Sequence, residues 1–210
     1  ADKEVTLLFD GAMSEARVYI NGKEACFWPF GYNSFHCDVT GLLNADGKNN
    51  VLAVRLENRP QSSRWYPGAG LYRNVRLVTT ERVHVPVWGT QLTTPHVSAE
   101  YASVRLRTTI RNAGDADVRI STDIIAPDGK IVARKDNSRK INHGQPFEQN
   151  FLINAPSLWS PETPYLYKAV SKIYVDGKQT DEYTTRFGIR SIEIIADKGF
   201  FLNGKHRKFQ

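Results

Sequence analysis

Long apolar runs are missing from this sequence of 210 residues. None approaches the roughly 18 apolar residues that a membrane-spanning helix needs, so we expect a soluble protein with no membrane partner. No signal peptide is recognisable, and the abrupt start at Ala1-Asp2-Lys3 suggests a processed or trimmed chain. The periplasm, the extracellular space and the cytoplasm all stay open as compartments.

Cysteine and metal-ligand motifs are also scarce. Cys26 and Cys37 are the only two cysteines, and they lie in one strand-rich segment. A disulfide would require that they face each other across a hairpin, and we favour two small buried thiols instead. The five histidines have no metal-ligand spacing with cysteine or acidic residues. We therefore expect neither a metal site nor a cofactor.

Clustered charge is missing as well, although the formal net charge is +6. The basic residues alternate with apolar ones, as in Val104-Arg105-Leu106-Arg107, which is typical of the solvated face of a half-buried strand. A nucleic-acid-binding surface needs a clustered basic patch or stripe. We therefore expect no nucleic-acid partner.

Strand-like segments are what the sequence does contain. With 40% hydrophobic and 11% aromatic residues, it has the composition of a folded globular protein. Segments rich in β-branched and aromatic residues recur along the chain, whereas no window shows sustained helical periodicity with caps. The expected strands are 5–9, 17–20, 51–56, 75–78, 103–110, 118–125, 130–134, 147–153, 167–175 and 183–187. The sequence therefore predicts an all-β fold with little helix.

Glycine follows asparagine or aspartate at four points between strand-like segments. Both residue types tolerate the positive φ that short turns between paired strands require. Each pair therefore predicts a hairpin. The four pairs are Asn21-Gly22, Asp128-Gly129, Asp176-Gly177 and Asn203-Gly204.

A polar patch at residues 79–82 separates two sets of strands. The residues after it have about seven strands with regular turns, which is the outline of a two-sheet immunoglobulin-like sandwich without the cysteine pair of an antibody domain. The residues before it have five or six strands, fewer than the eight or so of a jelly roll. The first block is therefore either a small independent sandwich or the back part of a larger one.

The segment Ser62–Val75 reads S-S-R-W-Y-P-G-A-G-L-Y-R-N-V. Its Gly68-Ala69-Gly70 lacks the third glycine and the following helix of a dinucleotide-binding loop, so we interpret it as a tight chain reversal entered through Pro67. Its three aromatic side chains are either core plugs or a stacking surface for a sugar, and the local chemistry favours core plugs. No nucleophilic triad is recognisable in the chain.

Several motifs then occur in a recognisable order. Those of the first block are Tyr19–Lys23, Gly31-Tyr32 with Phe35 and Asp38–Thr40, Asn50–Arg55, and Ser63–Arg73. Together they closely resemble the N-terminal sugar-binding domain of family 2 glycoside hydrolases, and best its β-galactosidase branch. The signature of that family's immunoglobulin-like second domain is similar to Leu158–Glu162, Pro164–Tyr167 and Phe187–Arg190. The hairpin that leads into the family's catalytic (β/α)8 barrel resembles Gly199–Lys205.

This resemblance implies part of a jelly-roll, galactose-binding-like sandwich followed by an immunoglobulin-like sandwich. Residues 1–82 would be the latter part of the sugar-binding domain, 83–190 the immunoglobulin-like domain, and 191–210 the lead-in to a barrel outside this chain. The family's two catalytic glutamates lie in that barrel, so we expect no catalytic residue here. The parent protein is expected to bind its glycan substrate through the barrel and to hydrolyse terminal β-galactosides.

The family's first domain also lends a loop to the rim of the substrate pocket. The resemblance points to Arg64 and Trp65 at that rim, the guanidinium donating to sugar oxygens or pairing with a barrel carboxylate. Some members have an acidic residue there that binds a sugar hydroxyl or a cation, whereas this sequence has Gln61-Ser62-Ser63-Arg64.

A first sandwich that is cut short exposes sheet edges, which predicts homo-oligomers formed through those edges. Three alternatives stay open for the function. Two are other activities of the same family, β-glucuronidase and β-mannosidase, and the third is a stand-alone carbohydrate-binding module.

Overall fold

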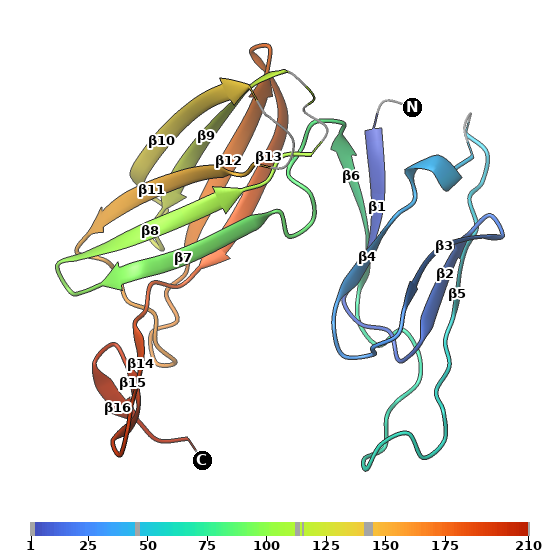
Figure 1. Cartoon of the computed structure of the whole chain (residues 1–210), viewed down its shortest axis with the longest axis horizontal. Coiled ribbons are helices and arrows are strands. Elements are labelled where there is room, and N and C mark those ends of the chain that lie inside the picture. Colours follow the sequence, from blue (N-terminus) through green and yellow to red (C-terminus); the bar gives the residue numbers. More distant parts are fainter. Residues whose placement is uncertain (1–2, 45–46, 112–113, 115, 141–144, 210) are drawn as a thin grey trace. The chain divides into compact units, whose positions relative to one another are not determined.

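A computed structural model of the chain describes residues 3–44, 47–111, 114, 116–140 and 145–209, so the first two residues of the abrupt start lie outside it. The described part is all β, apart from the three-residue 3-10 helix Thr40–Leu42. Within those ranges, no helix has the length and apolar character that crossing a membrane would require. The chain divides into two compact units, Ala1–Arg82 and Val83–Gln210 (Figure 1).

The first unit is a sandwich of two three-stranded antiparallel sheets, ordered β4-β1-β6 and β3-β2-β5. Its strands are β1 Lys3–Phe9, β2 Ala16–Ile20, β3 Lys23–Trp28, β4 Phe35–Asp38, β5 Leu52–Arg55 and β6 Val75–Glu81. Alternate residues of these strands point inward, as the period of two in a β-strand dictates. They form a buried core that includes Phe9, Val18 and Phe35.

One side of this sandwich is open at its two edge strands. Leu77 of β6 pairs with Leu7 of β1, so both side chains point to the inner face of the sheet. Leu7 is buried, whereas Leu77 is 65% exposed. In the other sheet, Leu52 of β5 pairs with the buried Ile20 and is 42% exposed. Apolar positions on the inner faces of both edge strands are thus accessible to solvent.

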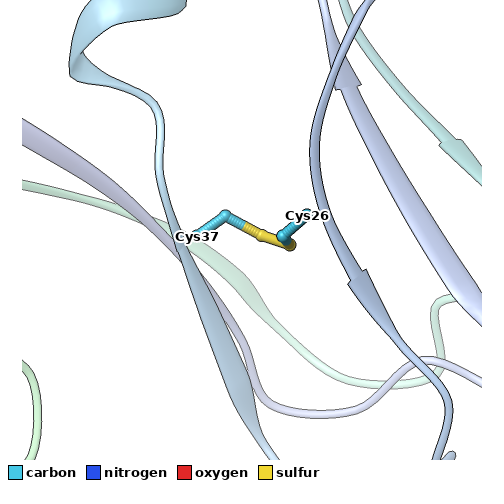
Figure 2. Close-up of a disulfide and its surroundings, with 2 residues drawn as sticks. All are labelled: Cys26 and Cys37. Atoms are coloured by element: carbon cyan, nitrogen blue, oxygen red, sulfur yellow. A yellow bond between two sulfur atoms is a disulfide. The ribbon is translucent and has the colours of Figure 1, made fainter.

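The two cysteines connect the sheets of the first unit. Cys26 on β3 and Cys37 on β4 form a disulfide, with their Cα atoms 5.8 Å apart (Figure 2). The expectation of two separate thiols is therefore wrong. Its physical reason is that β3 and β4 are consecutive in the chain but belong to opposite sheets, so the cysteines meet between the layers instead of across a hairpin.

The second unit contains the immunoglobulin-like sandwich that the sequence predicts. A four-stranded sheet, β10-β9-β12-β13, packs on a three-stranded sheet, β11-β8-β7. The strands are β7 Thr90–Val97, β8 Tyr101–Thr108, β9 Asp117–Ile125, β10 Ile131–Lys140, β11 Phe147–Asn154, β12 Tyr167–Val175 and β13 Lys178–Phe187. Leu106, Ile124 and Ile153 lie in its buried core.

A small sheet of β14 Ile192–Ile195, β15 Gly199–Leu202 and β16 Lys205–Arg207 ends the second unit. Asn203, in the β15–β16 turn, donates Nδ2 to the Trp159 carbonyl at 2.9 Å and accepts the Ser191 amide at 3.0 Å. Arg207 forms a two-pronged ion pair with Glu162. These contacts attach the small sheet to the loop that precedes β12.

All four predicted hairpins are present, and their glycines have φ between 72° and 88°. Several strands were not expected, among them β3, β4 and β7. In β7, Pro95 interrupts the strand-like pattern, yet β7 is an edge strand and its register shifts between Thr93 and His96. Proline is tolerated at such an edge because the missing amide need not bond to a neighbouring strand.

Candidate functional site

The segment between β5 and β6 contains the residues that the sequence marks as candidates. Figure 1 shows it as a long loop that projects beyond the ends of the strands. Gly70 exchanges two backbone hydrogen bonds with Met13, at 3.0 and 3.2 Å, and Asn58 donates Nδ2 to the Pro67 carbonyl at 3.2 Å. Gly70 has φ +119°, which favours glycine there. The positive φ explains the glycine at position 70, and a tight chain reversal entered through Pro67 stays a prediction.

The aromatic residues of this segment lie at the surface. Tyr66 is 100% exposed, Trp65 62% and Tyr72 45%. The favoured interpretation of these rings as core plugs is therefore wrong. The core of the first unit consists of side chains from its strands and from the segments between them, and the three loop rings are not among them.

Arg64 and Trp65 differ in how they are held. Arg64 is exposed, and it has neither an ion-pair nor a hydrogen-bond partner in the part of the chain that the structure describes. The Trp65 indole, in contrast, donates its Nε1–H to the Tyr32 hydroxyl at 2.6 Å. A free guanidinium thus lies next in the chain to a tryptophan whose orientation is held by a hydrogen bond.

Tyr32 and Phe30 belong to the loop between β3 and β4, and the sequence did not mark either as a site residue. The Tyr32 ring lies 6.4 Å from the Trp65 ring and 5.6 Å from the Phe30 ring, centroid to centroid. Phe30 is 55% exposed and Tyr32 50%. We name these three residues the aromatic surface. The available signal was the F-G-Y triplet at Phe30–Tyr32, but nothing local connects it to a tryptophan 33 residues away.

The two segments that form the aromatic surface carry side chains that are suited to contacting a ligand. Residues 58–74 and 29–34 contain no aspartate, glutamate, histidine or cysteine. General acid–base catalysis commonly uses such groups, whereas exposed aromatic rings and a guanidinium contact ligands. Elsewhere in the described ranges, no cluster of three or more histidine, cysteine, aspartate or glutamate residues could hold a metal ion.

The ion pair that attaches the small terminal sheet is the other chemically distinct feature. Hydrogen bonds from Arg207 lower the pKa of Glu162 to about 2. The pair borders a hollow of about 410 Å³ that is also lined by Leu202 and Asn203. Since both charges are already paired with each other, we interpret the hollow as part of the contact between the small sheet and the immunoglobulin-like sandwich.

Known proteins match this chain along nearly its whole length. The model of the family described as glycosyl hydrolases family 2 matches residues 85–190, half of the chain. A β-galactosidase of Bacteroides ovatus, BoGH2A, is 40% identical over 99% of this chain and 25% of its own length. A β-glucuronidase of Formosa agariphila is 31% identical over 98% of this chain and 23% of its own length.

A solved structure agrees with the fold. A glycosyl hydrolase family 2 member from Bacteroides cellulosilyticus superposes with a TM-score of 0.90 at 33% identity, covering 99% of this chain and 27% of that protein. The chain therefore spans about a quarter of the length of the relatives that it matches.

Proposed function

This chain belongs to glycosyl hydrolase family 2, and on that premise we propose that it is a non-catalytic part of a retaining hydrolase of terminal β-galactosides. The observation that carries the proposal is the 40% identity to a β-galactosidase over 99% of the chain. Residues 1–82 are then the latter part of the sugar-binding domain, 83–190 the immunoglobulin-like domain, and 191–210 the lead-in to the barrel.

The chemistry of such an enzyme explains why this part alone should be inactive. A retaining glycosidase needs two carboxyl groups about 5 Å apart, one as nucleophile and one as acid and base. We assign both to barrel glutamates outside these 210 residues. The contribution of this chain is to support the barrel and to complete the pocket.

Arg64 and Trp65 are the residues that we place at the rim of the pocket. Their exposure and the unpaired guanidinium of Arg64 support this role, because a rim residue must be accessible to the substrate. Arg64 would donate to sugar oxygens or pair with a barrel carboxylate. In the parent enzyme, Arg64→Ala and Trp65→Ala should lower kcat/KM without unfolding the protein.

Hydrolysis of β-glucuronides is the second candidate, because relatives with that name also match nearly the whole chain. The two candidates share the family and differ only in the sugar. Specificity in the family depends largely on barrel residues, so only the activity of the parent protein can distinguish the two sugars.

The test compares the purified chain with its full-length parent on a chromogenic β-galactoside and a chromogenic β-glucuronide. We expect the chain to be inactive on both and the parent to cleave the galactoside faster. Turnover by the chain after stringent purification would refute the non-catalytic role, and a preference of the parent for the glucuronide would refute the proposed sugar.

A further inference from the structure

The aromatic surface presents a tryptophan that is both exposed and held in orientation. Trp65 is 62% exposed, so most of its ring can contact a ligand. Its Nε1–H already donates the 2.6 Å hydrogen bond to the Tyr32 hydroxyl. Trp65 can therefore contact a ligand only through its apolar ring. Holding an aromatic ring in place before binding reduces the entropy lost when a ligand stacks on it.

Tyr32 is itself held in place, because the residue before it is tightly packed. The preceding Gly31 is buried, and a Cβ at that position would overlap the Met13 sulfur. The Tyr72 hydroxyl donates to the Gly31 carbonyl at 2.6 Å. Two segments far apart in the chain thus fix the loop that holds Tyr32. Phe30 completes the surface with its ring at 64° to the Tyr32 ring.

We propose that Tyr32 is a positioning residue that orients Trp65, and that Trp65 forms a stacking site for the apolar face of a galactose ring. This inference rests on the proposed function and deepens it. In galactose the axial hydroxyl at C4 lies on one face, which leaves the hydrogens of C3, C4 and C5 together on the other. In glucose and glucuronic acid the C4 hydroxyl is equatorial and this continuous C–H face is lost. A flat indole therefore favours galactosides over both.

A hydrogen-bond donor next to Trp65 suits the hydroxyls of such a ligand. Of the three arginines among residues 58–74, Arg59 is already paired with Glu15 at 3.0 Å. Arg64, next to Trp65 and without a partner in the described part of the chain, can donate to the hydroxyls at the edge of a stacked ring. Aromatic faces with a few polar donors are typical of sites for small polar ligands.

The experiment uses the 210-residue chain and the indole NMR signals of its four tryptophans. Trp65→Phe identifies the Trp65 signal. Methyl β-D-galactoside should shift that signal in a saturable way, and methyl β-D-glucoside, which differs only at C4, should bind about threefold to tenfold more weakly, as expected for an aromatic stacking contact.

Tyr32→Phe tests the positioning role, because it removes only the hydroxyl that accepts the indole hydrogen bond. We expect the free Trp65 indole signal to move, the Kd for methyl β-D-galactoside to rise about threefold to tenfold, and the unfolding midpoint to stay within error. Tyr165→Phe is the matched control, since Tyr165 is also exposed, at 45%, and lies in the other unit. It should change none of these readouts.

Three results would overturn the inference: no galactoside-dependent shift of the Trp65 signal, equal binding of the two epimers, or a Tyr32→Phe chain that behaves as the original. Each is distinct from failure of the proposed function, which the parent's hydrolysis measures. If the parent cleaves galactosides although the Trp65 signal of the chain does not shift, only the stacking site is refuted. If the chain binds the galactoside but the parent is specific for glucuronides, only the proposed sugar of the parent's reaction is refuted.

Discussion

Gln149 of β11 is a fully buried polar residue in the immunoglobulin-like unit, and Gln149→Leu should destabilise that unit. Its Oε1 accepts the Thr122 hydroxyl of β9 at 2.6 Å. Its Nε2 donates to the Lys135 carbonyl at 3.2 Å and to Asn137 Oδ1 at 3.1 Å, both on β10. One side chain of the three-stranded sheet therefore bonds to two strands of the opposite sheet.

The magnitude follows from these three hydrogen bonds. Each contributes a net of about 1 kcal/mol, and leucine, which has a similar size, offsets part of the loss by its greater apolar burial. The expected decrease in the free energy of unfolding is about 2 kcal/mol. With a urea m-value of roughly 1–3 kcal/mol/M for a small domain, the midpoint should fall by about 1 M.

Urea unfolding followed by circular dichroism is the assay, and only the transition of the second unit should move. Asn150→Leu is the matched control, because Asn150 is the next residue of β11 and its side chain is exposed. A Gln149→Leu chain as stable as the control, or more stable, would refute the reasoning, since it would mean that apolar packing replaces the hydrogen bonds without loss.

Three further predictions concern the disulfide, an ion pair and the open side of the first unit. Cys26→Ser with Cys37→Ser should destabilise the first unit by about 3 kcal/mol; two free thiols in the native chain would contradict the pairing. Arg207 lowers the Glu162 pKa from 4.5 to about 2, so its stabilisation of the terminal sheet is complete above pH 4.5 and is lost as the pH falls through about 2. Amide NMR signals of β16 in acid, with Glu162→Gln as reference, should show this loss. Two copies of the chain should associate through the edge strands β5 and β6, and Leu77→Lys should weaken this association. A clean monomer on size-exclusion chromatography would refute the association.

Local chemistry predicted the turns and most strands correctly. A hairpin such as the one at Asn21-Gly22 depends on the φ preferences of two adjacent residues, and the structure has both at positive φ. β7 was missed for a related reason: Pro95 argues against a strand unless the strand is known to be an edge, and edge position is a property of the sheet.

The candidate surface could be predicted only in part. Its segment was recognisable from its composition and from its family resemblance, and the rim roles of Arg64 and Trp65 stay predictions. Tyr32 was not recognisable as the partner of Trp65, because the contact joins two loops separated by 33 residues. The core-plug interpretation failed because an aromatic residue in a loop has the same local sequence whether it is buried or exposed.

The sequence by itself determined the all-β class, the four hairpins and membership of a glycosidase family, since each depends on neighbouring residues or on motifs in a set order. Only the tertiary structure decided that Cys26 pairs with Cys37, that Trp65 is exposed and that Tyr32 holds it. Those properties depend on which strands and loops face each other across a sandwich. That arrangement is set by the packing of segments far apart in the chain, and no short stretch of sequence encodes it.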